Sequence, residues 1–414
     1  MNKKSSNQRR HNLCVFRQLC NSIPTFLVPR LAAETGVGKL CRKFSAWSHV
    51  VAMLYTQLTH CIGLNDLCDS LQLHSGPLSA IRGATAPKRN TLSHANARRD
   101  AGLAEKLFWS VLEYLGNLQP KFTGGKRQRV LRRFRRAAYA VDSTVIQLVA
   151  NCMPWAKHRR RKAAAKLHVR LNLQSLLPQC AVIKTAAEHD NTRAVEVCAS
   201  LEEGEIVIFD KAYVWFWHLW QLATRGVFWV SRPKDNLDYR VTRRRIKKRQ
   251  GKILRDDEIK LRGAKSKLAY PGVLRRVVAL VELDGVEQEM VFLTNNLDWS
   301  AQSVADLYRC RWEIEKFFRQ IKQTLQLADF LGNSENAVKW QIWTALLLHV
   351  LLRFQAFLTS WPCAFTRLWA ICRSMTWNKI DILKLLRSYG TAGAPPRLQA
   401  TAYLGYLPGL EPNF

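Results

Sequence analysis

A run of apolar and β-branched residues with one acid in its middle is the feature that most restricts how this chain can fold. Residues 137–149 have the sequence AAYAVDSTVIQLV, which is typical of a buried strand, and the acid is Asp142. An ionised carboxylate in such a strand costs several kcal/mol unless it is hydrogen-bonded, paired with a base or bound to a metal ion. The run therefore predicts a sheet core in which Asp142 is either a satisfied structural acid or part of a site.

Strand-like and helix-like patterns alternate around this run. Alternating or continuous apolar residues indicate strands at 167–173, 180–184 and 205–209, and helices are indicated at 187–202 and 211–225. This alternation predicts an α/β fold in which helices pack on a sheet.

Four further strand patterns predict an antiparallel β insertion at about 226–298. They lie at 228–232, 240–242, 277–283 and 288–293. The turn Leu283-Asp284-Gly285 predicts a hairpin between the last two. Residues 243–249, with the sequence RRRIKKR, are predicted to form an exposed basic loop in the middle of the insertion.

Helical patterns occupy the region before the strands. Apolar residues recur at helical spacing through 13–118, and basic residues gather around the polar turns: Arg82, Lys88, Arg89, Arg98 and Arg99. Such helices suit a DNA-reading module or an ordinary helical bundle. A linker at 121–126 and a basic stretch at 126–136 precede the first strand.

The charge of the chain limits the classes of partner. Lys and Arg total 64 against 31 Asp and Glu, a formal net charge of +33. A charge of this size repels itself unless a polyanion neutralises it, which favours nucleic acid over an anionic membrane surface. The apolar stretch 342–358 contains His349, Arg353 and Gln355, and is shorter than the roughly 20 residues that a membrane span needs. It is predicted to be a buried core helix.

The cysteines indicate neither a zinc ribbon nor a redox pair. There are 11 of them, and no Cys-x-x-Cys spacing occurs. Residues 2–12 are polar and basic and are followed by no cleavage pattern, so a secretory signal is not expected. Cysteines such as Cys14, Cys180 and Cys310 are therefore expected to be reduced thiols in a cytosolic protein.

A second acid lies at the end of another apolar strand. Asp210 directly follows 205–209, and ligands of α/β sheets collect at the carboxyl ends of strands. Two such acids favour a shared Mg²⁺ or Mn²⁺, because these hard cations prefer carboxylate oxygens. The alternative is that Asp210 caps the helix that follows it.

A third acid lies in a polar stripe on a predicted long helix at 300–327. Tyr308, Arg311, Glu315 and Lys322 fall within a sector of about 60° at 100° per residue. The helix can present Glu315 to a metal ion while Arg311 and Lys322 flank it to hold phosphates. An ordinary ion pair between Arg311 and Glu315 explains two of these residues but not the whole stripe.

The Tyr-x2-Arg-x3-Glu-x6-Lys spacing resembles the hallmark of DDE transposases of the "insertion sequence four" group. Asp142 in AVDST and Asp210 in DKAY resemble the first two acids of that family, in the same order. Further similar segments are Thr91-Leu92-Ser93-His94-Ala95-Asn96, Lys166-Leu167-His168 and His189-Asp190. Two departures are Lys211, where Arg is common, and Asn172, where relatives often carry an acid. The resemblance covers roughly residues 40–350.

The resemblance implies a ribonuclease-H-like catalytic core interrupted by the β insertion, with helical N- and C-terminal regions. The implied regions are a DNA-binding region at 1–120, the catalytic domain at 130–340 and a helical region at 341–414. The 105 residues that separate Asp210 from Glu315 accommodate the insertion.

It further implies that Asp142, Asp210 and Glu315 bind two Mg²⁺ ions, for which Mn²⁺ can substitute. The residues expected to contact DNA are Tyr308, Arg311, Lys322, Arg319, Lys211, Arg243, Arg244 and Arg245. The implied substrates are the terminal inverted repeats of an element and its target DNA, which a homodimer would bind in a synaptic complex.

The implied location is the bacterial cytoplasm, at the nucleoid and without a membrane partner. Trp229 and Trp299 are either stacking partners for a flipped base or core residues. Two other functions fit the same residues, namely a metal-dependent nuclease without strand transfer and an inactive DNA-binding regulator.

Overall fold

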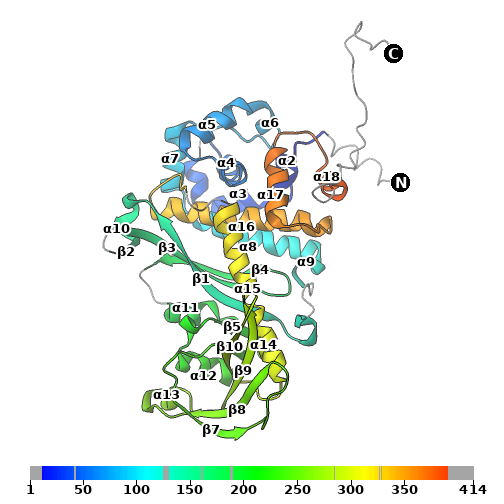
Figure 1. Cartoon of the computed structure of the whole chain (residues 1–414). Coiled ribbons are helices and arrows are strands. Elements are labelled where there is room, and N and C mark those ends of the chain that lie inside the picture. The colour runs from blue at the N-terminus through cyan, green and yellow to red at the C-terminus, as the bar shows by residue number, and fades with distance from the viewer. Residues whose placement is uncertain are drawn as a thin grey trace, which may run out of the picture.

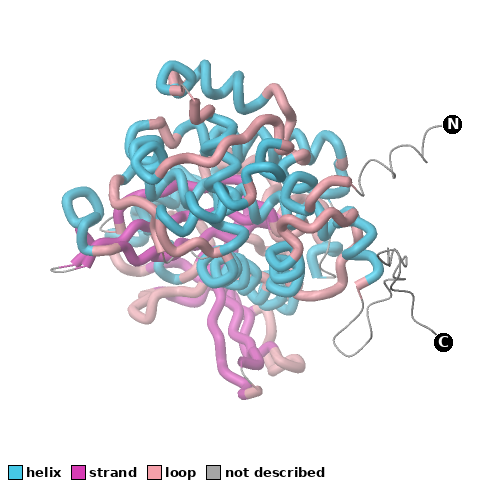
Figure 2. The backbone as a smooth tube through the Cα atoms, turned by 90° about the horizontal axis from the view of Figure 1, so that it is seen from above, coloured by secondary structure: helices cyan, strands magenta, loops and turns pink. Residues whose placement is uncertain are grey.

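The computed structural model describes residues 12–389, apart from 42, 125–129, 160–161, 187–189, 284, 326 and 328. Helices from both ends of the chain form the upper part of the molecule, and one long sheet with its own helices forms the lower part (Figure 1). Seen from above, the helices gather over the sheet, and a group of strands projects beyond them on one side (Figure 2). The predicted α/β class is confirmed.

One mixed sheet connects the strands of the described residues. Its order is β2-β3-β1-β5-β6-β10-β9-β8-β7, and β4 also pairs with β3. The strands are β1 (Ala138–Leu148), β2 (Lys157–Arg159), β3 (Lys162–Asn172), β4 (Leu177–Thr185), β5 (Ile206–Phe209), β6 (Phe228–Ser231), β7 (Tyr239–Arg244), β8 (Ile253–Leu261), β9 (Leu274–Leu283) and β10 (Val286–Thr294).

The central strands are apolar on both faces because the sheet separates two cores. Ala138 and Ala140 of β1 pack into the core shared with the helical body, whereas Tyr139 and Val141 pack into a second core on the opposite face. Strand β1 runs antiparallel to β3 and parallel to β5, and β5 runs parallel to β6. The continuous apolar pattern of 137–149 follows from this burial on both faces.

The second core is covered by the helices α11 (Asp190–Val197) and α12 (Phe216–Thr224). These correspond to the two helices predicted after the strands at 180–184 and 205–209. The start of the first prediction, at 187–189, lies outside the described residues, and so does His189.

Strands β7–β10 form an antiparallel extension that continues the same sheet. Strand β10 joins it to the central strands by pairing with β6, with Leu293 opposite Ser231. The hairpin between β9 and β10 is confirmed by their pairing from Val286 and Leu283 onward, although Asp284 of the turn lies outside the described residues.

Two expectations about this extension were wrong. Strand β8, with the sequence ILRDDEIKL, has no counterpart among the predicted strands, because its charged residues hide the alternation. Arg243 and Arg244 belong to β7 rather than to an exposed loop, and they lie opposite Glu258 and Asp257 of β8. The charges on β8 are therefore complementary to those on β7.

Helices from both ends of the chain share one core. Helix α16 (Glu335–Leu358) packs against α4 (Ala46–Thr59), α7 (Arg89–Arg98) and α8 (Gly102–Leu118). The remaining helices around it are α2 (Val15–Cys20), α3 (Leu27–Glu34), α5 (Leu64–Leu73), α6 (Ser75–Ser79), α9 (Pro120–Gly124), α17 (Phe365–Ser374) and α18 (Ile382–Ser388).

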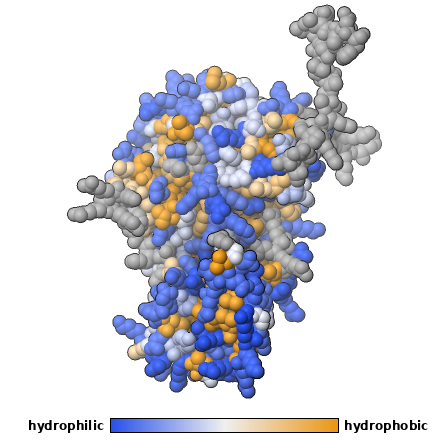
Figure 3. All heavy atoms as spheres, viewed as in Figure 1, coloured by the Kyte–Doolittle hydropathy of each residue, from blue (hydrophilic) through white to orange (hydrophobic). Residues whose placement is uncertain are grey.

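Helix α16 is long and apolar enough to cross a membrane, but 78% of its most apolar window is buried inside the protein. The predicted core helix is therefore confirmed. All 11 cysteines lie in the described part of the chain, and none forms a disulfide. Hydrophilic side chains cover much of the face shown in Figure 3.

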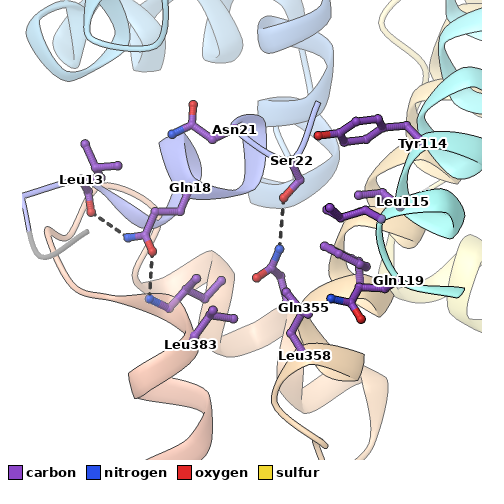
Figure 4. Close-up of a pocket in the computed structure, with 13 residues that line it drawn as sticks. Leu13, Gln18, Asn21, Ser22, Tyr114, Leu115, Gln119, Gln355, Leu358 and Leu383 are labelled. Carbon is purple, nitrogen blue, oxygen red and sulfur yellow. Dashed lines mark hydrogen bonds between the residues drawn. The ribbon is translucent and has the colours of Figure 1, made fainter. Parts of the chain in front are cut away.

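A cavity of about 440 Å³ marks the junction of the two chain ends (Figure 4). Gln18 of α2 donates to the carbonyl of Leu13 and accepts from the backbone of Ile382, and Gln355 of α16 donates to Ser22. The cavity contains none of the predicted site residues. Its side chains connect α2 to α16 and to the start of α18.

The predicted single helix at 300–327 is divided. Helix α14 (Ala301–Arg309) is followed by α15 (Trp312–Arg319) and a π-helical turn (Gln320–Thr324). Between α14 and α15 the backbone is tightened, because the N–H groups of Arg311 and Ile314 donate to carbonyls three residues earlier. The tightening occurs where side chains of this segment reach the acids of the sheet.

Candidate active site

Asp142 and Asp210 are neighbours because of the register between the parallel strands β1 and β5. Val141 pairs with Phe209, and the next residue on each chain is an acid. Asp210 is the first residue after β5, so both acids lie where a buried strand reaches the edge of the parallel part of the sheet. This edge is where α/β sheets bind ligands.

Arg311 connects Asp142 to the third acid. Its guanidinium donates to Asp142 Oδ2 at 3.2 Å and to Glu315 Oε1 at 2.6 Å. Helix α15, which carries Glu315, packs on β1. Arg311 is only 11% exposed, whereas Glu315 is 45% exposed, so the pair lies at the border between the interior and solvent.

Tyr308 connects the same helical segment to the second acid. Its hydroxyl donates to Asp210 Oδ1 at 3.4 Å, and the guanidinium of Arg311 lies 5.6 Å from the centre of its ring. Phe292 of β10 packs against Tyr308, with the two ring centres 5.0 Å apart. Two residues of the predicted stripe, Tyr308 and Arg311, therefore contact the two acids of the sheet, and Arg311 links them to Glu315.

The electrostatics of the site are unfavourable for Asp142. Burial raises the pKa of its carboxyl from 3.8 to about 6, and the charges of Asp210 and Glu315 act in the same direction. The N–H of Ser143 and the guanidinium of Arg311 oppose the rise. Ionising Asp142 therefore costs free energy, because its carboxyl is buried and lies close to two other carboxylates.

The same surroundings shift the pKa values of Tyr308 and Arg311. Burial raises the pKa of Tyr308 to about 12, so its hydroxyl is a neutral donor. Burial alone would lower the pKa of Arg311, but Tyr308 and the three acids raise it above its usual value. Arg311 is a permanent cation surrounded by carboxylates.

The donor chemistry of this cluster fits a hard divalent cation, because carboxylate oxygens are its preferred ligands. Within the residues that the structure describes, no group of three or more His, Cys, Asp or Glu side chains is arranged to hold a metal ion by itself. Arg311 supplies the positive charge between Asp142 and Glu315. It shows that these acids can share one cation.

Two polar residues of β3 lie at different distances from the acids, His168 next to Asp142 along the sheet and Asn172 opposite Tyr139 near the start of β1. His168 of β3 lies opposite Ser143, and its Nδ1 is 3.3 Å from the hydroxyl of Tyr213, which follows Asp210 by three residues. Asn172 accepts hydrogen bonds from the backbone of Gln174 and Ser175. Asn172 therefore shapes a turn, which explains why an uncharged residue is suitable there.

Among the described residues, the predicted DNA-contact residues Lys211, Arg319 and Lys322 form no ion pair with the three acids. Lys211 directly follows Asp210 and forms an exposed ion pair with Asp235 at 3.5 Å. Arg319 and Lys322 continue the helix of Glu315. Burial lowers the pKa of Lys322, and this lysine forms no ion pair with any side chain in the described parts of the chain.

Arg243, Arg244 and Arg245 lie elsewhere, on or next to the outermost strand of the extension. Arg245 pairs with Glu258 at 3.0 Å and with Asp256 at 3.7 Å, and Arg243 pairs with Glu258 at 3.6 Å. The structure does not bring these arginines to the three acids. Arg245 is partly buried and belongs to a structural network.

Trp229 is fully buried, and Trp299 packs edge-on against Phe134 and Phe228. Trp229 is a core residue and Trp299 is partly buried against the core, in agreement with the second of the two predicted roles. The residue that the sequence interpretation missed is Arg232. Because Phe209 pairs with Ser231, Arg232 follows β6 at the level of Asp210, and its charge acts on Tyr308. Only the register of the sheet reveals this position.

Comparisons with known proteins agree with the resemblance to DDE transposases. Residues 133–351 match the family described as Transposase DDE domain, and residues 11–81 match a domain of unknown function. The protein y4zB of Sinorhizobium fredii, which is named as a transposase, is 34% identical over 277 residues, covering 66% of this chain and 72% of its own length.

Two further relatives are named after insertion sequence elements. A Geobacillus stearothermophilus protein named as the transposase of element IS5377 is 30% identical over 224 residues, covering 54% of this chain and 57% of its own length. Transposase InsG of element IS4 from Escherichia coli is 25% identical over 199 residues, covering 46% of this chain and 43% of its own length.

Proposed function

Because the chain belongs to the transposase DDE-domain family and is a DNA transposase of the insertion sequence four type, we propose that Asp142, Asp210 and Glu315 are its catalytic metal ligands. The observation that carries this proposal is the contact of Arg311 with Asp142 and Glu315, next to Asp210. Asp142 of β1 and Glu315 of α15 are distant in sequence and share one cationic group, whose pKa the charge of Asp210 also raises.

The catalytic domain that we propose is a ribonuclease-H-like core at 130–340, with β7–β10 as its insertion. It is supported by the strand order β4-β3-β1-β5-β6, in which the first three strands are antiparallel and the last three are parallel. The flanking regions of the proposal are 1–120, with a DNA-binding role, and 341–414. Helix α16 belongs to the body that these two flanking regions form together.

Enzymes of this family depend on divalent metal ions, and Mg²⁺ is the ion that we propose, with Mn²⁺ as a substitute. When bound, a pair of such ions activates the attacking oxygen and stabilises the leaving oxygen of a phosphodiester. Asp142, Asp210 and Glu315 would hold them, since carboxylates at one strand edge and on a facing helix offer the required oxygens.

The other side chains of the cluster position the DNA. Arg311 carries two N–H groups that now meet carboxylates and can equally meet phosphate oxygens, for which its planar guanidinium is suited. Tyr308 remains protonated and donates from beside Asp210. Lys322 and Arg319 on the same helical segment, and Lys211 after Asp210, add positive charge around the reacting phosphate.

The substrates in this proposal are the terminal inverted repeats of the element and its target DNA. Hydrolysis at the element end releases a 3′ hydroxyl, which attacks the target strand, and a homodimer holds the two ends in a synaptic complex. The net charge of +33 supports a polyanionic partner. The proposed location is the bacterial cytoplasm, at the nucleoid.

The decisive experiment is Asp142→Asn, assayed for Mg²⁺-dependent cleavage of duplex DNA that carries the element ends. We expect cleavage to fall by about a thousandfold or more, while end binding is retained. Asp298→Asn is the matched control, because Asp298 is exposed and lies outside the cluster. Measurable nicking by well-folded Asp142→Asn would refute the metal-site assignment. Joined products in the wild-type reaction distinguish this enzyme from a nuclease.

A further inference from the structure

One cavity of this strongly basic protein has no charged side chain in its described lining. It is the cavity of about 440 Å³ between α2, α8, α16 and the start of α18 (Figure 4). Its lining consists of Leu, Ile, Phe and Tyr side chains together with uncharged Gln, Asn and Ser. Phosphates are bound largely by Lys and Arg, so this cavity does not suit DNA. Its ligand belongs to another class.

The cavity is apolar both in its wall and at its rim. Leu115, Phe354 and Ile382 line it and are buried. Tyr114 and Leu118, one helical turn apart on α8, also line it, although they remain 39% and 54% exposed. Exposed apolar side chains that surround an apolar cavity commonly mark a surface that binds another apolar group.

The polar groups of the lining suit a peptide. Asn21 and Gln119 contribute carboxamides that form no hydrogen bond within the described part of the chain. A carboxamide both donates and accepts, so it can pair with the N–H and C=O groups of a backbone. Since a cavity of roughly 150 Å³ holds one benzene-sized group, this one accommodates about two or three large side chains. An apolar peptide segment is the class of ligand that fits.

The chain itself supplies such a segment directly after α18. Residues 390–414 lie outside the described residues, and their charged side chains are one base and one acid, Arg397 and Glu411. Their formal charge is therefore zero, in a chain whose net charge is +33. Leucines and tyrosines are concentrated at 403–410, which has the sequence YLGYLPGL. The uncharged segment is complementary to the uncharged cavity.

The segment starts close enough to reach the cavity. Ile382 and Leu383 of α18 line it, and the helix ends at Ser388. At 1.5 Å per residue, the chain from Leu383 to Tyr389 covers roughly 9 Å. Residues 390–402 can span up to about 45 Å, which is more than the return to the cavity requires. A ligand on a short tether has an effective concentration on the order of millimolar.

We propose that residues 403–410 dock in this cavity, with their leucine side chains against Leu115 and Leu383 and beneath Tyr114 and Leu118. A second copy of the chain is a poorer occupant, because two molecules of charge +33 repel each other when no DNA lies between them. The docked segment covers the junction at which α2, α8, α16 and α18 meet. This interaction is independent of the three acids.

The test is photo-crosslinking of the full chain with p-benzoylphenylalanine in place of Leu118, which is exposed enough to be replaced without disturbing the core. The control carries the same group in place of Leu73, which is 84% exposed and does not line the cavity. Trypsin cleaves after Arg397 and releases a peptide that begins at Leu398. We expect position 118 to crosslink to this peptide about tenfold more than position 73 does.

Substitutions in the segment sharpen the test. Leu404→Asp combined with Leu407→Asp should lower the crosslink yield at position 118 about tenfold or more, because it removes two apolar side chains from the cavity. Gln399→Asp adds a negative charge outside 403–410 and should leave the yield unchanged.

An equal mixture of ¹⁴N- and ¹⁵N-labelled protein distinguishes the two occupants. Crosslinked peptides of a single isotope show that each molecule binds its own segment, whereas mixed pairs at the frequency of random pairing would show that a second copy does. Mixed pairs, crosslinks from position 118 only to other parts of the chain, or an undiminished yield in the double leucine variant would overturn the proposal. None of these results bears on the proposed function, which fails separately if Asp142→Asn still cleaves DNA.

Discussion

Arg275 and Arg311 both hold carboxylates, and they do so differently. Arg275 in the β extension is 1% exposed and binds both oxygens of Asp256, at 2.8 and 2.7 Å. Its remaining N–H groups donate to the carbonyls of Leu297 and Trp299. Arg311 is 11% exposed, meets two different acids with one bond each, and its Nε has no partner among the described residues.

This difference in hydrogen bonding distinguishes a structural ion pair, that of Arg275, from a candidate ligand-binding site, that of Arg311. A buried pair with every donor satisfied fixes one geometry, here the attachment of β8 and β9 to the segment that leads into α14. The Arg311 cluster has three acids, incomplete hydrogen bonding and a carboxyl whose pKa is raised to about 6. Such an arrangement leaves charge available to a ligand, in keeping with its proposed role.

The largest expected effect concerns stability. Asp256→Asn should lower the free energy of unfolding by about 3 to 5 kcal/mol, because it leaves Arg275 buried without its counter-charge. Asp142→Asn should not lower it, since the substitution removes a carboxylate that burial and like charges destabilise. Urea denaturation of the two variants measures this contrast. A similar loss in both would mean that the two networks are equally structural.

The second prediction concerns pH. Because its pKa is raised, the carboxyl of Asp142 binds its proton more tightly in the folded state than in the unfolded state. Its contribution to the free energy of unfolding therefore falls as pH rises from 3.8 through about 6, and is constant above that. At 1.36 kcal/mol per unit, the full change is about 3 kcal/mol. The difference in unfolding free energy between Asp142→Asn and the wild type should therefore grow across this window, in favour of the variant. A difference that is independent of pH would contradict it.

How far these sites could be predicted depends on how local their signals are. Asp142 and Glu315 could be identified as candidate site residues from the sequence. A lone acid in an apolar strand and a polar stripe on a helix are both patterns of a few neighbouring residues. Strand β8 was not, because Asp256 and Asp257 look like loop residues until their arginine partners on the neighbouring strands are known.

Arg232 and the break between α14 and α15 were missed for a related reason. The position of Arg232 beside Asp210 requires the register of two parallel strands, which is set by contacts distant in sequence. The helix break leaves the apolar periodicity unchanged, and it is visible only in the backbone hydrogen bonds of Arg311 and Ile314. Periodicity reports which face is buried, but not whether each turn is regular.

A third prediction uses neighbouring arginines to sharpen the comparison within the extension. Arg245→Ala should cost about 1 to 2 kcal/mol of stability, because it removes contacts with Asp256 and Glu258. Arg244 is exposed and forms no ion pair with the described side chains, so Arg244→Ala should leave stability unchanged. If the extension contacts DNA, Arg244→Ala weakens binding of all sequences alike and reduces the salt slope by about 1. Loss of affinity for one sequence alone would instead show that Arg244 contacts bases.

The smallest expected effect tests whether the stripe beyond Arg311 belongs to the site. Lys322 and Lys316 lie on the same helical segment, but Lys316 pairs with Glu313 at 2.9 Å, whereas Lys322 is partly desolvated and has no ion pair among the described residues. A desolvated lysine without a counter-charge gains most from a phosphate. Lys322→Ala should therefore slow formation of the DNA end complex about tenfold, or about 1.4 kcal/mol, and Lys316→Ala should have little effect. Equal rates for the two variants would limit the functional part of the stripe to Tyr308, Arg311 and Glu315. Lys322 would then be a surface residue of the π-helical turn without a role in DNA binding.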